Sequence, residues 1–95
     1  MTAYLIAEVD VHDPVVYEDY KALAATAVAL YGGEYIARGG AAELLEGWPR
    51  PQRVVIIRFA DLATIRAWHA SPEYAKARAV RERAATSRFQ IVDGL

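Results

Sequence analysis

The sequence predicts an α+β fold in which four strands and two helices follow one another in the order βαββαβ. Two observations carry this prediction. Short runs rich in Val, Ile and Leu recur between breaks that contain Gly, Pro or Asp, which is typical of strands. The pairs Asp13-Pro14 and Ser71-Pro72 each supply an N-cap acceptor followed by a proline suited to the first helical turn. A chain of 95 residues is expected to form one domain over residues 1–95.

The first half of the chain predicts three elements, which are a strand at residues 4–11, a helix from Pro14 to about Tyr31 and a strand at residues 34–38. Gly32 can adopt the positive φ of a helix C-cap. Gly39-Gly40 favours a bulge or bend directly after the second strand, and residues 42–46 are a candidate continuation of it.

The second half predicts a strand at residues 53–59, a helix capped by Asp61, a second helix from Pro72 to about Ala85 and a last strand at residues 88–92. The run Val54-Val55-Ile56-Ile57 is apolar on both faces, which indicates a central position in the sheet. Between the second and third strands, two prolines are expected to hold Trp48 at the surface in a rigid loop.

This order is the ferredoxin-like split βαβ arrangement with a four-stranded antiparallel sheet. Right-handed crossovers place both helices on one face of the sheet and leave the other face bare. The residues expected on the bare face are Tyr4, Ile6, Glu8, Ile36, Arg38, Val54, Ile56, Arg58, Gln90 and Val92. Because so apolar a surface is costly to expose, we expect a second copy to cover it, forming a two-fold homodimer with a cavity between the two sheet faces.

Composition supports assembly and excludes several classes of function. Hydrophobic residues make up 55% of this small chain, which is more than its limited core can easily hide. A net charge of −1 argues against nucleic acid as a partner, and the lack of cysteine excludes thiolate chemistry. No apolar run approaches the roughly 20 residues that span a bilayer, and no signal peptide is seen, so we expect a cytoplasmic protein without a membrane partner.

Several stretches together resemble the domain-of-unknown-function 1330 family of the dimeric α+β barrel superfamily. They lie at residues 7–10, 32–40, 45–47, 53–57, 67–74 and 92–94, and so extend over essentially the whole chain. The resemblance implies the same fold as the element order. The superfamily includes cofactor-free monooxygenases, isomerases, dehalogenase-like enzymes and haem-handling proteins. The chain departs from the family pattern at Arg58, Ala60 and His69, where an acidic residue, a proline and a tyrosine are expected.

Arginine supplies the candidate ligand-binding residues. Strict alternation along residues 34–38 places Arg38 beside Ile36 on the bare face, and the following glycines leave room for a ligand. The guanidinium groups of Arg38 and Arg53 suit a carboxylate or another planar oxyanion. The alternative for both arginines is an ion pair with Glu8, Glu46 or another acid. Metal binding is not expected, because the two histidines lack ligand spacing.

Two further groups of residues are candidates. Glu8 and Arg58 share the bare face, where they either line the cavity or neutralise each other. Trp68 and Tyr74 flank the helix break and form either the aromatic wall of a pocket or part of the core.

His69 and Glu46 are the candidate proton-transfer residues, although a surface or structural role is open for each. The first of three hypotheses is therefore an enzyme without a cofactor, or the remnant of one, that acts on a small organic acid or aromatic compound in the cavity of a homodimer. The alternatives are a dimeric module that binds a similar ligand without catalysis, and a structural dimer without a ligand.

Overall fold

A computed structural model of the chain describes residues 2–47 and 52–95. The elements are β1 (Ala3–Val11), α1 (Pro14–Leu30), β2 (Glu34–Arg38), β3 (Arg53–Phe59), α2 (Leu62–Ala70), α3 (Pro72–Ala84) and β4 (Ala85–Asp93). The predicted βαββαβ order is confirmed, with the second helical segment divided at Ser71. Trp48 lies outside the described residues.

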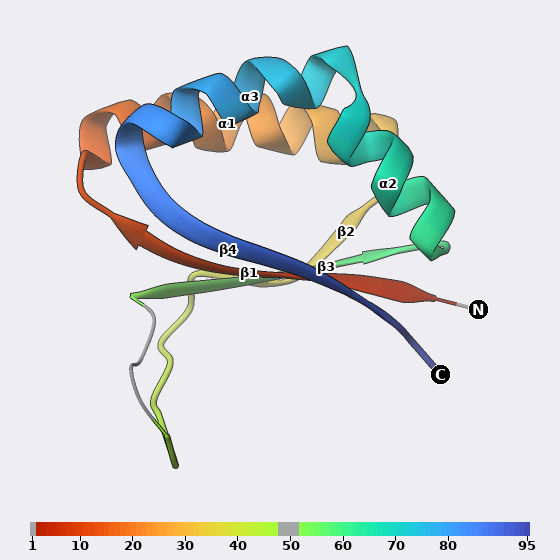
Figure 1. Cartoon of the computed structure of the whole chain (residues 1–95), viewed down its shortest axis with the longest axis horizontal. Helices are drawn as coiled ribbons and strands as arrows, with labels where there is room; N and C mark the ends of the chain where they lie inside the picture. Colours follow the sequence, from red (N-terminus) through yellow and green to blue (C-terminus); the bar gives the residue numbers. More distant parts are fainter. Residues whose placement is uncertain (1, 48–51) are drawn as a thin grey trace.

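The four strands form one antiparallel sheet in the order β2-β3-β1-β4. Figure 1 shows α1 and α3 lying side by side over one face of this sheet, with α2 at one end of the layer. The two central strands, β3 and β1, are also the most apolar, as the run in β3 predicts. This is the predicted ferredoxin-like fold. No helix in the described part of the chain is long and apolar enough to cross a membrane.

The core lies between the sheet and the helices. Along β1 the side chains alternate, so that Leu5, Ala7 and Val9 are buried under the helices. The largest fully buried side chains are Trp68, Tyr74, Phe59, Ile65 and Val28. The helix α1 packs on the sheet through a face that carries Tyr17 and Tyr20 as well as small apolar residues. These two tyrosines also line a pocket.

The predicted helix caps are present. The Asp13 carboxylate accepts a hydrogen bond from the Val16 amide at 3.1 Å, and the Asp61 carboxylate accepts one from Thr64. Ser71 Oγ accepts from the Tyr74 amide at 3.1 Å and donates to the Trp68 carbonyl at 2.7 Å. Because Ser71 is almost fully buried, water cannot replace either bond, and this residue both ends α2 and begins α3.

Two segments differ from the prediction. The strand β4 begins at Ala85, three residues before the expected Arg88, because α3 passes directly into it and the Ala84 carbonyl accepts from the amides of His12 and Asp13. Residues 42–46 do not continue β2. They are exposed and irregular, and Figure 1 shows this yellow-green segment projecting from the sheet away from the helices.

The predicted position of Arg38 on the bare face is wrong. The sheet irregularity lies earlier than Gly39-Gly40: Tyr35 pairs with Ile57, whereas Arg38 pairs with Val55, so β2 holds one extra residue at Ile36. A bulge of this kind changes which face the following side chains point to. Since Ile57 and Val55 are both buried under the helices, Tyr35 and Arg38 both lie on the helix side.

The other residues predicted for the open face lie in register with one another. Tyr4 is opposite Arg58 and Val92, and Ile6 is opposite Ile56 and Gln90. The predicted pair of Glu8 with Arg58 is wrong, because Arg58 lies opposite Glu34 in the β2–β3 register. Arg58 pairs with Glu34 at 2.6 Å, and Glu8 pairs with Arg88, its direct neighbour on β4, at 2.8 Å.

We expect Ser71→Ala to lower the free energy of unfolding by about 0.5–2 kcal/mol, because the cap of α3 is lost in a site that water cannot reach. The measurement is chemical denaturation of the parent and the variant. Equal unfolding midpoints would show that Ser71 does not hold the junction between α2 and α3.

Candidate functional site

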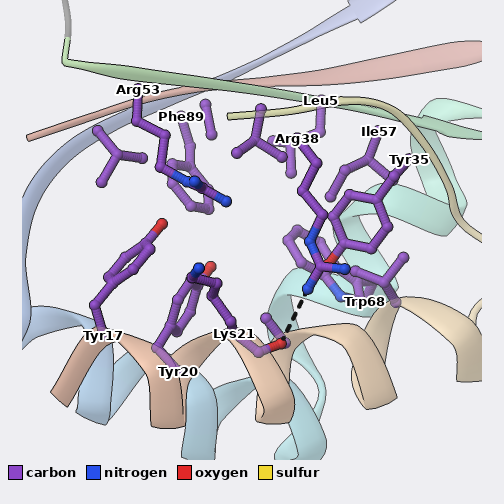
Figure 2. Close-up of a pocket in the computed structure, with 15 residues that line it drawn as sticks. Leu5, Tyr17, Tyr20, Lys21, Tyr35, Arg38, Arg53, Ile57, Trp68 and Phe89 are labelled. Atoms are coloured by element: carbon purple, nitrogen blue, oxygen red, sulfur yellow. Dashed lines mark hydrogen bonds between the residues drawn. The ribbon is translucent and has the colours of Figure 1, made fainter. Parts of the chain in front are cut away.

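A pocket lies between the sheet and α1, on the side where Arg38 and Arg53 meet the helix. We call it the α1 pocket. It has a volume of about 30 Å³ and is lined by Leu5, Ala7, Val9, Tyr17, Tyr20, Lys21, Ala24, Val28, Tyr35, Arg38, Arg53, Val55, Ile57, Trp68 and Phe89. Figure 2 shows Tyr17 and Tyr20 rising from α1, with Arg38 and Arg53 reaching toward them from the sheet.

A wider hollow continues outward from the α1 pocket, and we call it the outer hollow. It measures about 290 Å³, and the two spaces share Tyr17, Lys21 and Arg53. Its remaining described lining residues are Val11, Pro14, Glu18, Gly39 and Gln52. Most of the combined space lies in the outer hollow, and together the two spaces reach the roughly 300 Å³ at which pockets begin to hold small organic ligands.

Arg38 lies at the edge of the α1 pocket. The bulge in β2 turns it toward α1, where its Nη2 atom donates to the Lys21 carbonyl at 3.5 Å (Figure 2). Its guanidinium carbon lies 4.3 Å from the centre of the Tyr35 ring, in a cation–π arrangement. One long hydrogen bond leaves most of the five guanidinium N–H groups available to another acceptor.

Arg53 approaches the same space from β3. Its guanidinium carbon lies 5.6 Å from the centre of the Tyr17 ring, and its buried Nε atom has no hydrogen-bond partner among the described residues. Gly39 makes room for it: a Cβ at that position would lie 2.0 Å from Arg53 Nη1, and the φ of +73° already favours glycine. The glycine therefore admits the guanidinium to the pocket.

The electrostatics of the site favour an anion. In the part of the chain that the structure describes, neither Arg38 nor Arg53 forms an ion pair, and no carboxylate lines the α1 pocket. The Lys21 ammonium also borders it but pairs with Glu18 at 2.9 Å. Two unpaired guanidinium groups beside an apolar floor form a site for a planar oxyanion.

The tyrosines of the pocket stay neutral. Burial raises the pKa of Tyr17, while the charge of the nearby Arg53 opposes part of this change. Burial likewise raises the pKa of Tyr20 and of Tyr35. These phenols therefore act as hydrogen-bonding groups, with their hydroxyl protons in place at neutral pH.

Trp68 and Tyr74 are both core residues, and they differ in their relation to the pocket. Trp68 lines its inner wall, is 1% exposed and has an Nε1 atom without a described partner. Tyr74 is fully buried in α3 and packs on Trp68 with 4.2 Å between ring centres. Its hydroxyl reaches the pocket indirectly, through the hydroxyl of Tyr20 at 2.9 Å.

The two predicted proton-transfer residues lie elsewhere. Glu46 is in the exposed segment that projects away from the helices. His69 does not line the α1 pocket but borders another hollow of about 280 Å³ between α2 and β4, which shares Leu5, Trp68 and Phe89 with that pocket. The His69 carbonyl accepts a hydrogen bond from Arg78. Partial burial, with help from Arg78 and Arg81, lowers the pKa of His69. The structure thus does not bring His69 or Glu46 to Arg38.

Glu8 and Arg58 lie on the open sheet face, also outside the α1 pocket.

The pocket residues that α1 contributes are not among those predicted from the sequence. On α1, Tyr17 and Tyr20 lie on the buried face, and Lys21 lies at its edge. On β2, the half-buried Tyr35 lies on the side that faces the helices. The spacing of the tyrosines in the sequence could have indicated the site. Tyrosines three residues apart on an otherwise small apolar helix face carry hydroxyl groups that need partners when buried.

We expect Gly39→Ala to destabilise the fold by about 1–2 kcal/mol, because alanine disfavours positive φ, and to displace the Arg53 guanidinium. Gly40→Ala is the matched control, since a Cβ there would have no atom within 4 Å and the φ is not strained. Thermal unfolding of the two variants checks this. Equal melting temperatures for both would contradict the positive φ of Gly39.

Comparisons with known proteins bear on the fold and the family. The family model described as "Domain of unknown function (DUF1330)" matches residues 2–95. A search of curated proteins finds no match.

Solved structures share the fold at low sequence identity. RPA0582 from Rhodopseudomonas palustris, a protein of unknown function, has a TM-score of 0.82 at 19% identity, over 99% of this chain and 82% of that one. SnoaB, a cofactor-independent oxygenase from Streptomyces nogalater, has a TM-score of 0.69 at 19% identity, over 99% and 93%. A dimeric protein of unknown function from Bacteroides fragilis has a TM-score of 0.65 at 13% identity, over 98% and 96%.

Proposed function

The chain belongs to the DUF1330 family, and we propose that it binds a small organic acid or phenol in the α1 pocket as the substrate of a reaction that needs no cofactor. One observation carries this proposal: Arg38 and Arg53 extend from neighbouring strands into one apolar pocket without a carboxylate partner among the described residues. The site lies within one copy of the chain, between its sheet and α1, rather than between two sheet faces.

The shape of the pocket indicates how the ligand lies. The guanidinium groups of Arg38 and Arg53 reach from the sheet toward α1, while the apolar side chains of Leu5, Ile57 and Phe89 line the sheet side (Figure 2). An anionic group placed between the guanidinium groups leaves an apolar body that extends from the α1 pocket into the outer hollow. A charge-assisted hydrogen bond of this kind contributes about 1.5–3 kcal/mol.

The same charges support catalysis. A phenol or enol bound beside Arg38 and Arg53 has its anionic form stabilised, so its pKa falls and an electron-rich anion becomes available at neutral pH. The structural similarity to SnoaB, a cofactor-independent oxygenase, supports chemistry of this class. The alternative is a module that binds the ligand without changing it. The lack of a histidine or carboxylate among the described pocket residues favours that alternative.

We expect Arg38→Lys to weaken binding of a small aromatic carboxylate, because the charge remains but the planar fork is lost. Arg38→Ala should weaken it by about tenfold to a hundredfold. The measurement is the ligand-dependent rise in melting temperature of parent and variants. Mass spectrometry of the recovered ligand separates an enzyme, which changes it, from a binding module, which does not.

Arg83→Ala is the matched control, because Arg83 is exposed near the end of α3 and borders neither the α1 pocket nor the outer hollow. Equal stabilisation of all four proteins by the carboxylate would show that Arg38 does not hold it. Unfolding of ligand-free Arg38→Ala would assign the arginine a structural role.

We further propose that two copies pack through the open faces of their sheets. The apolar residues of this face are half-buried or exposed, with Ile36 at 48% and Val92 at 46% exposure, and they surround the half-buried Ile56. The pairs Glu34–Arg58 and Glu8–Arg88 satisfy charges that such an interface would cover. The dimeric state of the Bacteroides fragilis neighbour supports this proposal.

We expect Ile56→Asp to dissociate this dimer, because an unpaired carboxylate would be buried at the centre of the interface. Val15→Asp is the control, since Val15 is 79% exposed on α1. Sedimentation at micromolar concentration measures both. A dimer that survives Ile56→Asp, or a parent protein that is monomeric, would contradict the proposal.

A further inference from the structure

A chain of three polar side chains leads from α3 into the α1 pocket. Arg81 Nη1, in the last turn of α3, donates to the Tyr74 hydroxyl at 2.8 Å. The Tyr74 and Tyr20 hydroxyl oxygens lie 2.9 Å apart. Tyr74 is fully buried and borders no part of the pocket, whereas Tyr20 is 8% exposed and lines it. The chain therefore begins at a cation and ends at the ligand space.

The direction of the protons in this chain follows from counting donors. A guanidinium group can only donate, so the Tyr74 oxygen accepts from Arg81. Each tyrosine has one hydroxyl proton. One of these two protons forms the hydrogen bond between the tyrosines, and the other is available to an acceptor outside the pair. If Tyr74 kept the spare proton, it would be unpaired in a fully buried position, which is costly. The arrangement that avoids this cost has Tyr74 donating to Tyr20, and Tyr20 donating into the pocket.

We propose that Tyr20 is a hydrogen-bond donor to the ligand, oriented by Arg81 through Tyr74, and that the ligand carries a carbonyl-type oxygen in addition to its anionic group. This inference rests on the proposed function, because it assigns a second contact to the same bound molecule. It narrows the ligand class to oxo acids and acyl- or oxo-substituted aromatic acids. Tyr74 and Arg81 are positioning residues, since they act only through Tyr20.

The surroundings of Tyr20 fit a donor to a neutral oxygen. Its hydroxyl carries no charge, because burial raises its pKa. The cationic groups Arg38 and Arg53 enter from the opposite wall, so the anionic group has its own partners (Figure 2). Arg81 is fixed by a second contact, with its guanidinium carbon 4.5 Å from the centre of the Phe89 ring. The donor is thus held in place before a ligand arrives.

The experiment compares ligands that differ only at the predicted acceptor. The aromatic probes are 4-acetylbenzoate and 4-isopropenylbenzoate, in which C=CH₂ replaces C=O at nearly equal size. The flexible pair, 4-oxopentanoate and 4-methylpent-4-enoate, makes the same change in an aliphatic acid. Dissociation constants are measured for the parent and for Tyr20→Phe, Tyr74→Phe and Tyr31→Phe. Tyr31→Phe is the matched control, because Tyr31 follows α1 and borders neither the α1 pocket nor the outer hollow.

We expect the parent and Tyr31→Phe to prefer the oxo ligand of at least one pair by about threefold to tenfold, the range of a neutral hydrogen bond. Tyr20→Phe should remove the preference while keeping affinity for both carboxylates. Tyr74→Phe should reduce it. The infrared C=O band of the bound oxo ligand should move to lower frequency in the parent and should return to its unshifted position in Tyr20→Phe. If the hydrogen bond between Tyr20 and Tyr74 only held α1 and α3 together, the two variants would lose stability, but the preference for the oxo ligand and the position of its C=O band would not change.

The outcomes separate the two proposals. If both members of each pair bind equally to the parent, or if Tyr20→Phe keeps the preference and the band position, the role of Tyr20 is wrong while the anion pocket stands. If no carboxylate binds and Arg38→Ala behaves like the parent, the proposed function fails, and the role of Tyr20 fails with it.

Discussion

The bulge in β2 determines the chemistry of the helix-covered side of the sheet. By adding one residue at Ile36, it turns Arg38 toward α1, to the side where Tyr35 already lies. Without it, regular alternation would bring Ala37 to that side and leave Arg38 on the open face. The open face then loses a charge and becomes better suited to a second copy, while the α1 pocket gains a cation. One local irregularity thus separates the surface proposed for assembly from the site proposed for the ligand.

The pocket depends on three structural conditions that support one another. Gly39 admits the Arg53 guanidinium, the bulge supplies Arg38, and α1 presents Tyr17 and Tyr20 from above. Two guanidinium groups that line one pocket repel each other when no counter-charge is present. The fold offers cation–π contacts with Tyr17 and Tyr35, which offset part of this cost. A bound anion would offset the remaining repulsion, so the two guanidinium groups without a described carboxylate partner point to an anionic ligand.

Much of the architecture could be predicted because its signals are local. Asp13, Asp61 and Ser71 cap helices through their own side chains, and β3 is apolar on both faces, so the element order follows from short stretches. The site could not be predicted in the same way. The bulge at Ile36 has no glycine to mark it, and the partner of Arg58 depends on the register between β2 and β3. Pairing across strands decides both, and a single sequence does not encode that register in neighbouring residues.

We propose that Arg38 and Arg53 together hold an anion beneath α1. A crystal structure of the protein grown with a small aromatic carboxylate would test this. We expect the bulge at Ile36, the carboxylate between the two guanidinium groups, and the ring in the combined space of the α1 pocket and the outer hollow within each copy of the chain. Arg38 on the open sheet face, or a carboxylate bound between the sheets of two copies while the α1 pocket stays closed, would contradict it.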